Sequence, residues 1–174
     1  MAQPSTPRPG AILLVEDCYD VRIGLAQLLT LNGYRVTDTA DGEHAIDELN
    51  ANPEGFALIL LDLLLPGSIS GNDVRARQLA DPQLATVPTV VVTAFEPEAE
   101  AQAVLKPEVW LEKPFRGEQL LSVVRRYVRP DGPGLVSGFG VRHPAFDDPT
   151  LDDPGSDVAD SMATPRPPRA DLKI

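Results

Sequence analysis

The sequence predicts an α/β fold in which helices cover both faces of an open, parallel β-sheet. Two features support this class. Several short apolar runs lack alternation with polar residues, which is typical of strands buried on both faces. Each run is followed by an amphipathic stretch, so that strand and helix alternate five times between residues 11 and 129. A closed barrel needs about eight such units. We therefore expect a doubly wound sheet of five strands.

The expected strands are the short apolar runs that end at a polar residue or a turn. They are residues 11–15, 34–39, 56–61, 88–92 and 109–111. The run at 88–92 is rich in β-branched residues, which favour strands.

The expected helices are the stretches whose apolar residues repeat with helical spacing. The first stripe is Val21, Leu25, Leu28 and Leu29, followed by the stop signal Asn32-Gly33. The others lie around Ala45, Ile46 and Leu49, over 72–80, over 98–105, and along Leu120, Val124, Tyr127 and Val128.

Composition divides the chain of 174 residues into three zones. Residues 1–10 contain proline and glycine and are expected to form a flexible N-terminal arm. Residues 11–129 carry nearly all of the periodic apolar pattern and form the predicted domain. Residues 130–174 hold eight of the eighteen prolines. This tail, rich in Pro, Gly and Asp, is expected to be disordered because it cannot bury enough apolar surface.

The formal net charge of −11 argues against partners that carry many phosphates. A nucleic-acid binder needs a basic face, and an anionic membrane repels an acidic protein. No apolar run approaches the roughly 20 residues of a membrane span. The single cysteine, Cys18, excludes an internal disulfide. We therefore expect a cytoplasmic protein that binds neither nucleic acid nor membranes.

Charged and hydroxyl side chains follow the ends of four predicted strands. They are Glu16-Asp17, Asp62, Thr93 and Lys113. The carboxyl ends of parallel strands share one edge of a sheet, where ligands bind in doubly wound folds. Clustered carboxylates suit Mg²⁺, a hard cation that prefers oxygen ligands. With an ammonium group and a hydroxyl nearby, the cluster predicts a site for a phosphoryl group.

Four motifs in this order resemble the receiver domain of bacterial response regulators. They are Leu13 to Asp17 (LLVED), Leu60 to Pro66 (LLDLLLP), Val91 to Ala94 (VVTA) and Trp110 to Phe115 (WLEKPF). The resemblance spans residues 11–129. It implies a flavodoxin-like sheet with strand order 2-1-3-4-5, and an aspartate that is phosphorylated by a histidine kinase or a histidine phosphotransfer protein.

The resemblance also implies roles for individual residues. Asp62 corresponds to the phosphoacceptor. Glu16 and Asp17 correspond to the acid pocket, which with Asp62 and the main-chain carbonyl of Leu64 would hold Mg²⁺.

Four further residues match the motif positions that sense the phosphoryl group. Lys113 corresponds to the family's lysine, joined to Pro114 by a cis bond. Thr93 corresponds to the switch hydroxyl, Ala94 to the small residue that follows it, and Trp110 to the switch aromatic. The interval from Thr93 to Lys113 is shorter than usual, which bears on the output surface.

Three functions remain open. The first is a single-domain response regulator that is not an enzyme, receives a phosphoryl group on Asp62 and signals through contacts with a downstream protein that the sequence does not name. The second is a receiver-like scaffold that acts without phosphorylation. The third is a phosphatase with an aspartyl nucleophile. A phosphatase normally has a second acid two positions after the nucleophile, and Leu64 at that position argues against it.

Overall fold

The computed structural model describes residues 7–94 and 99–131. Within these residues, five strands form one parallel sheet in the order β2-β1-β3-β4-β5. The strands are β1 (Ala11–Val15), β2 (Val36–Thr39), β3 (Phe56–Asp62), β4 (Thr89–Thr93) and β5 (Val109–Glu112). The predicted fold class and the strand order that the resemblance implies are both confirmed.

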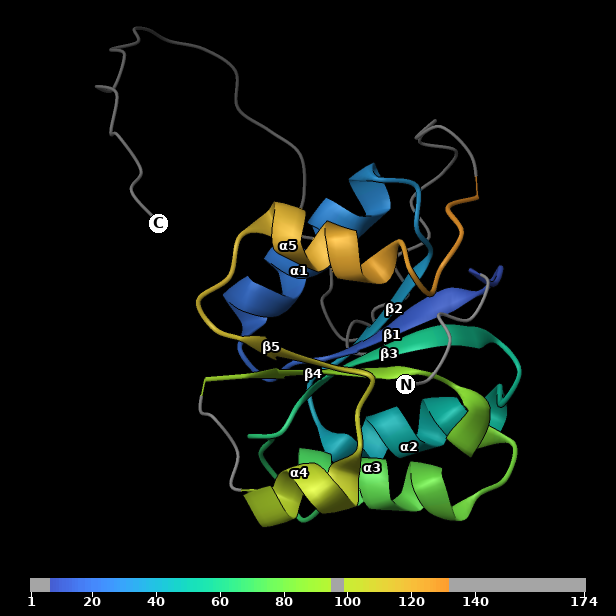
Figure 1. The fold of residues 1–174 in the computed structure, drawn as a ribbon, viewed down its shortest axis with the longest axis vertical. Coiled ribbons are helices and arrows are strands. Elements are labelled where there is room, and N and C mark those ends of the chain that lie inside the picture. The colour runs from blue at the N-terminus through green and yellow to red at the C-terminus, as the bar shows by residue number, and fades with distance from the viewer. Residues whose placement is uncertain (1–6, 95–98, 132–174) are drawn as a thin grey trace, which may run out of the picture. The chain divides into compact units, whose positions relative to one another are not determined.

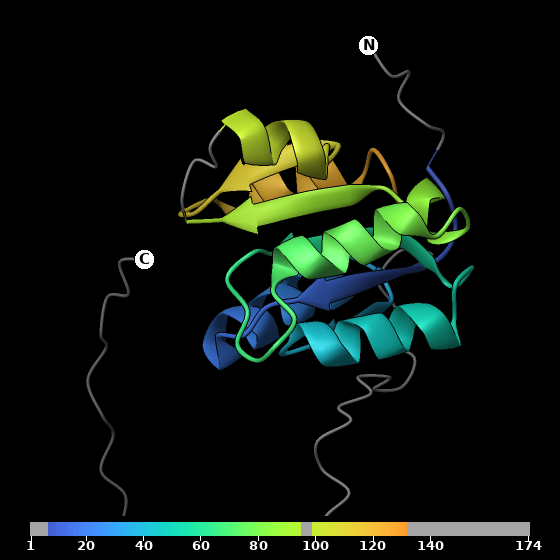
Figure 2. The same ribbon diagram turned by 90° about the horizontal axis from the view of Figure 1, so that it is seen from below.

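Helices cover both faces of the sheet (Figure 1). The described helices are α1 (Tyr19–Leu31), α2 (Gly42–Ala51), α3 (Gly71–Ala80), the 3₁₀ turn η1 (Leu84–Thr86), α4 (Ala99–Leu105) and α5 (Gly117–Val124). Helices α1 and α5 lie on one face, and α2, α3 and α4 lie on the other. Figure 2 looks onto this second face and shows α2, α3 and α4 side by side.

Apolar and polar residues do not alternate along the inner strands, and the structure shows why. Every residue of β3 and of β4 is buried, because both strands lie inside the sheet and are covered from both sides. Neighbouring side chains of one strand enter different cores. Ile12 and Leu14 of β1 pack with α1 and α5, whereas Leu13 and Val15 pack with α2 and α3.

Most of the predicted bounds of strands and helices agree with the structure to within one residue, and the larger differences are local. Strand β2 begins at Val36 rather than at residue 34, because the chain around the buried Tyr34 is still completing the turn after α1. The turn η1 was not predicted. Helix α5 ends at Val124, so that Tyr127 and Val128 lie beyond it.

Val128 is buried in the core beside α1 and α5, and its N–H still donates to the Val124 carbonyl at 2.9 Å, so that a helical turn continues past the end of α5. It forms a parallel bridge with Arg8, in which the Arg8 N–H donates to the Tyr127 carbonyl at 2.9 Å. Arg8 belongs to the predicted arm 1–10, so that an isolated bridge already ties part of this arm to the domain. Residues 1–6 and 132–174 lie outside the described residues, and the three domain boundaries stay predictions.

None of the helices described is long and apolar enough to cross a membrane.

Candidate phosphoryl-acceptor site

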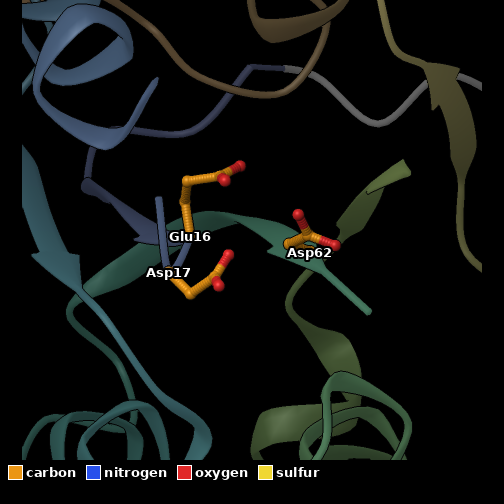
Figure 3. A group of neighbouring side chains, drawn as sticks. All are labelled: Glu16, Asp17 and Asp62. Carbon is orange, nitrogen blue, oxygen red and sulfur yellow. The ribbon is translucent and has the colours of Figure 1, made fainter. Parts of the chain in front are cut away.

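Three carboxylates gather at the carboxyl edge of the sheet (Figure 3). Glu16 and Asp17 directly follow β1, and Asp62 is the last residue of the adjacent strand β3. One carboxylate oxygen from each lies within 4.8 Å of the others. Glu16 and Asp62 are buried, whereas Asp17 is exposed. Two acidic groups are thus held out of water by the packing of the sheet, and the third opens the cluster to solvent.

Lys113 joins two of these carboxylates. It follows β5, and its Nζ donates to Oδ2 of Asp62 at 2.6 Å and to Oε2 of Glu16 at 2.7 Å. The ammonium group offsets the repulsion between the two buried carboxylates. The Lys113–Pro114 bond is cis, as the resemblance implies.

Burial and pairing act in opposite directions on the acid–base groups of this cluster. Burial raises the pKa of Glu16, and the hydrogen bond from Lys113 offsets only part of that increase. Burial by itself would lower the pKa of Lys113, but hydrogen bonds to Asp62 and Glu16 outweigh it and raise the pKa. Lys113 is therefore a permanent positive charge beside Asp62. A cation bound among the carboxylates would favour the ionised form of Glu16.

The loop after β3 orients Asp62. The Leu64 N–H donates to Oδ1 of Asp62 at 2.9 Å, so that the loop and Lys113 each hold one oxygen of the carboxylate. Gly71 opens α3 directly against this loop. A Cβ at position 71 would lie 2.1 Å from the main-chain oxygen of Asp62, so that only glycine permits this approach.

The main chain of β4 and β5 places Thr93 next to Lys113. Thr93 is buried at the end of β4, and its carbonyl accepts from the Lys113 N–H at 2.7 Å. Ala94 follows and is exposed. Trp110 is half-buried on β5 in register with Val91, two residues before Thr93 on β4. The structure thus gathers Glu16, Asp17, Asp62 and Lys113 at the centre, with Thr93 beside them and Trp110 further along β5.

One contributor was missed by sequence reasoning. Arg22 of α1 donates from one guanidinium nitrogen to the carbonyls of Glu16 and Asp17, at 2.8 and 3.1 Å. The only signal in the sequence is an arginine that follows the acidic pair by five and six residues. Contacts to main-chain carbonyls leave no periodic pattern in the sequence.

A sheet of this order with three acids and a lysine at its carboxyl edge defines a receiver-type domain. The family model for the response regulator receiver domain matches residues 12–125. The chain therefore belongs to the receiver-domain family of response regulators in two-component signalling.

Known proteins support this assignment. The sensory transduction protein RegX3 of Mycobacterium tuberculosis is 33% identical over 128 residues, which cover 70% of this chain and 52% of RegX3. The chain spans about half the length of the curated relatives it matches.

Solved structures agree with the fold. The chemotaxis protein CheY4 of Vibrio cholerae matches with a TM-score of 0.62 and 24% identity, over 70% of this chain and all of that chain. The receiver domain of the sensor histidine kinase PA1611 from Pseudomonas aeruginosa, solved with magnesium in its active-site cleft, has a TM-score of 0.59 and 29% identity. This second match covers 69% of this chain and 98% of that chain.

Proposed function

We propose that Asp62 accepts a phosphoryl group from a phosphohistidine of a histidine kinase or phosphotransfer protein. The observation that carries this proposal is the bridge of Lys113 between Asp62 and Glu16, at 2.6 and 2.7 Å. It places a permanent positive charge against the buried carboxylate of Asp62, within an acidic cluster that Asp17 opens to solvent. A nucleophile beside a fixed cation is the arrangement that transfer of an anionic group requires.

The donor set fits Mg²⁺. Glu16, Asp17 and Asp62 supply carboxylate oxygens within 4.8 Å of one another, and hard cations of this kind select oxygen ligands. Glu16, Asp17, Asp62 and the carbonyl of Leu64 would hold the ion, with Glu16 acting through water. When bound, Mg²⁺ supplies charge neutralisation on the phosphoryl oxygens. The magnesium in the cleft of the PA1611 receiver domain supports this choice.

The transfer forms one bond and breaks another. A carboxylate oxygen of Asp62 attacks the phosphorus, an O–P bond forms, and the N–P bond of the donor breaks with its electron pair returning to the imidazole. Lys113 keeps its proton throughout and shifts from the two carboxylates toward the transferred group. Thr93, beside Lys113, would donate its hydroxyl hydrogen to a phosphoryl oxygen, and the main-chain N–H of Ala94 would do the same.

The proposed function is that of a signalling domain and not of an enzyme that acts on a separate substrate. Position 64 holds a leucine that is 57% exposed, so that the second acid of an aspartyl phosphatase is missing at that position. We include in the proposal that the output of this receiver domain is contact with another protein.

The remaining alternative is a receiver-type scaffold that works without phosphorylation. Incubation with radiolabelled acetyl phosphate and Mg²⁺ separates the two. The proposal expects an acid-stable, base-labile adduct that Asp62→Ala abolishes. Asp47→Ala, which removes an exposed aspartate of α2, is the matched control and keeps the adduct. Wild-type protein that stays unlabelled, although it is folded and binds Mg²⁺, would favour the scaffold.

A further inference from the structure

Arg22 connects helix α1 to the segment that carries the acidic pair. Its guanidinium donates to the main-chain carbonyls of Glu16 and Asp17 at 2.8 and 3.1 Å. These contacts are made to the backbone and do not use the two carboxylates, of which that of Glu16 accepts from Lys113. The position of the Arg22 side chain therefore influences the orientation of the Glu16 and Asp17 side chains.

Two further side chains, those of Asp38 and Tyr19, contact the guanidinium of Arg22. Its Nε donates to Oδ2 of Asp38 on β2 at 3.1 Å, and the two side chains are only 12% and 3% exposed. The ring of Tyr19 lies 5.6 Å from the guanidinium carbon, within the range of a cation–π contact. The planar guanidinium presents Nε to the carboxylate and a second nitrogen to both carbonyls in a fixed geometry, which the single nitrogen of an ammonium does not reproduce.

The pairing with Asp38 has an electrostatic consequence. An unpaired cation close to Glu16 and Asp17 would repel a metal ion and attract the two carboxylates toward itself. Because the carboxylate of Asp38 compensates the charge of Arg22, the guanidinium can hold the loop without competing with a cation for its ligands.

We infer that Arg22, anchored by Asp38, is a positioning residue for the cation site formed by Glu16, Asp17 and Asp62. This inference rests on the proposed function, because it assumes that a divalent cation binds there. Groups that orient metal ligands from outside the ligand set typically change metal affinity by about tenfold to a hundredfold.

The test is the affinity for Mg²⁺ alone, measured by isothermal titration calorimetry on the full chain. Arg22→Met removes the hydrogen bonds and keeps much of the apolar stem. We expect Mg²⁺ binding to weaken about tenfold or more. Arg22→Lys keeps the charge beside Asp38 and should give an affinity between those of wild type and Arg22→Met. Arg77→Met removes an exposed arginine of α3 with the same change in charge, and should bind as wild type does.

A second measurement separates positioning from a general loss of stability. Labelling of Arg22→Met by acetyl phosphate should approach the wild-type rate when Mg²⁺ is raised to saturation, because only ligand placement has changed. Circular dichroism and urea unfolding report whether each variant folds. If Arg22→Met does not fold, Arg22→Lys decides the question alone.

The inference is overturned if folded Arg22→Met and Arg22→Lys bind Mg²⁺ as wild type does, or if Arg77→Met loses as much affinity. It is also overturned if labelling of Arg22→Met stays slow at saturating Mg²⁺. Failure of the proposed function would look different, since wild-type protein itself would then bind no Mg²⁺ or take up no label.

Discussion

Nζ of Lys113 lies 2.6 Å from Oδ2 of Asp62, although the two residues are 51 positions apart in the chain. Asp62 ends β3 and Lys113 follows β5, and β4 lies between these strands in the sheet. The contact therefore passes over the end of β4, where Thr93 is buried. We therefore expect a group added to Asp62 to be sensed at the end of β4.

Replacing Lys113 should slow phosphorylation much more than it disturbs the fold. Lys113→Met removes the charge that faces Asp62 and Glu16, and loss of one such donor typically costs about a hundredfold in rate. The measurement is the initial rate of labelling by acetyl phosphate at saturating Mg²⁺. Lys106→Met changes an exposed lysine just after α4 and is the control. Equal rates for the two variants would contradict the role of Lys113.

Arg75 should matter for stability, because it is a buried cation that ties α3 to its neighbours. It is 2% exposed and donates to the carbonyls of Leu105 and Lys106 at the end of α4, to Gln78 and to Thr89. Arg75→Ala leaves these buried acceptors without their donor, so that the free energy of unfolding should fall by about 3 kcal/mol. Arg77→Ala, on the exposed side of the same helix, should change it by roughly 0.5 kcal/mol at most. Urea unfolding measures both, and similar losses would refute the assignment.

The phosphorylated form should lose its phosphoryl group slowly. Hydrolysis needs a water in line with the O–P bond, and the Leu64 side chain beside Asp62 offers no hydrogen bond to orient one. Leu64→Asn should shorten the lifetime of the adduct severalfold, as followed by decay of the label. Leu31→Asn, at an exposed leucine of α1, should leave it unchanged. Phe95, the second residue expected to flank this approach, lies outside the described residues. An unaltered decay in Leu64→Asn would count against this explanation.

Phosphorylation should not drive dimerisation through the face formed by α4, β5 and α5. Helix α4 has only seven residues and therefore offers few side chains for symmetric pairing. Sedimentation velocity with Mg²⁺, with and without the phosphoryl mimic beryllofluoride, should give a monomer in both cases. A dimer that appears only with beryllofluoride and is lost in Val104→Asp, at an exposed residue of α4, would show that this face does pair.

The sequence predicted the positions of site residues where the pattern lies within one strand or helix. Asp62 and Thr93 could be placed at strand ends because uninterrupted apolar runs mark buried parallel strands, and such strands end at one edge. Val128 was assigned to a helix because it continues the spacing of Leu120 and Val124. Val128 lies beyond the end of α5, but its N–H still donates to the Val124 carbonyl and its side chain lies in the same core, as the spacing indicates. Its bridge to Arg8, more than a hundred residues away in the chain, leaves no such pattern in the sequence.

Polar residues with distant partners were the hardest to interpret. Arg75 and Gln78 lie on the buried side of α3, where a sequence pattern leads one to expect apolar residues. Their partners are side chains and carbonyls of β4, η1 and the end of α4, which no spacing within α3 reveals. The role of Arg22 could not be predicted from the sequence either, because two of its acceptors are the main-chain carbonyls of Glu16 and Asp17.

The central claim is that Asp62 itself carries the phosphoryl group. Borohydride reduces an aspartyl phosphate to homoserine, so that reduction after acetyl phosphate treatment with Mg²⁺, followed by peptide mass spectrometry, identifies the modified residue. The account predicts homoserine at position 62 in wild type and none when Mg²⁺ is chelated. Homoserine at another aspartate, or a phosphorylated protein whose Asp62 stays intact, would contradict it.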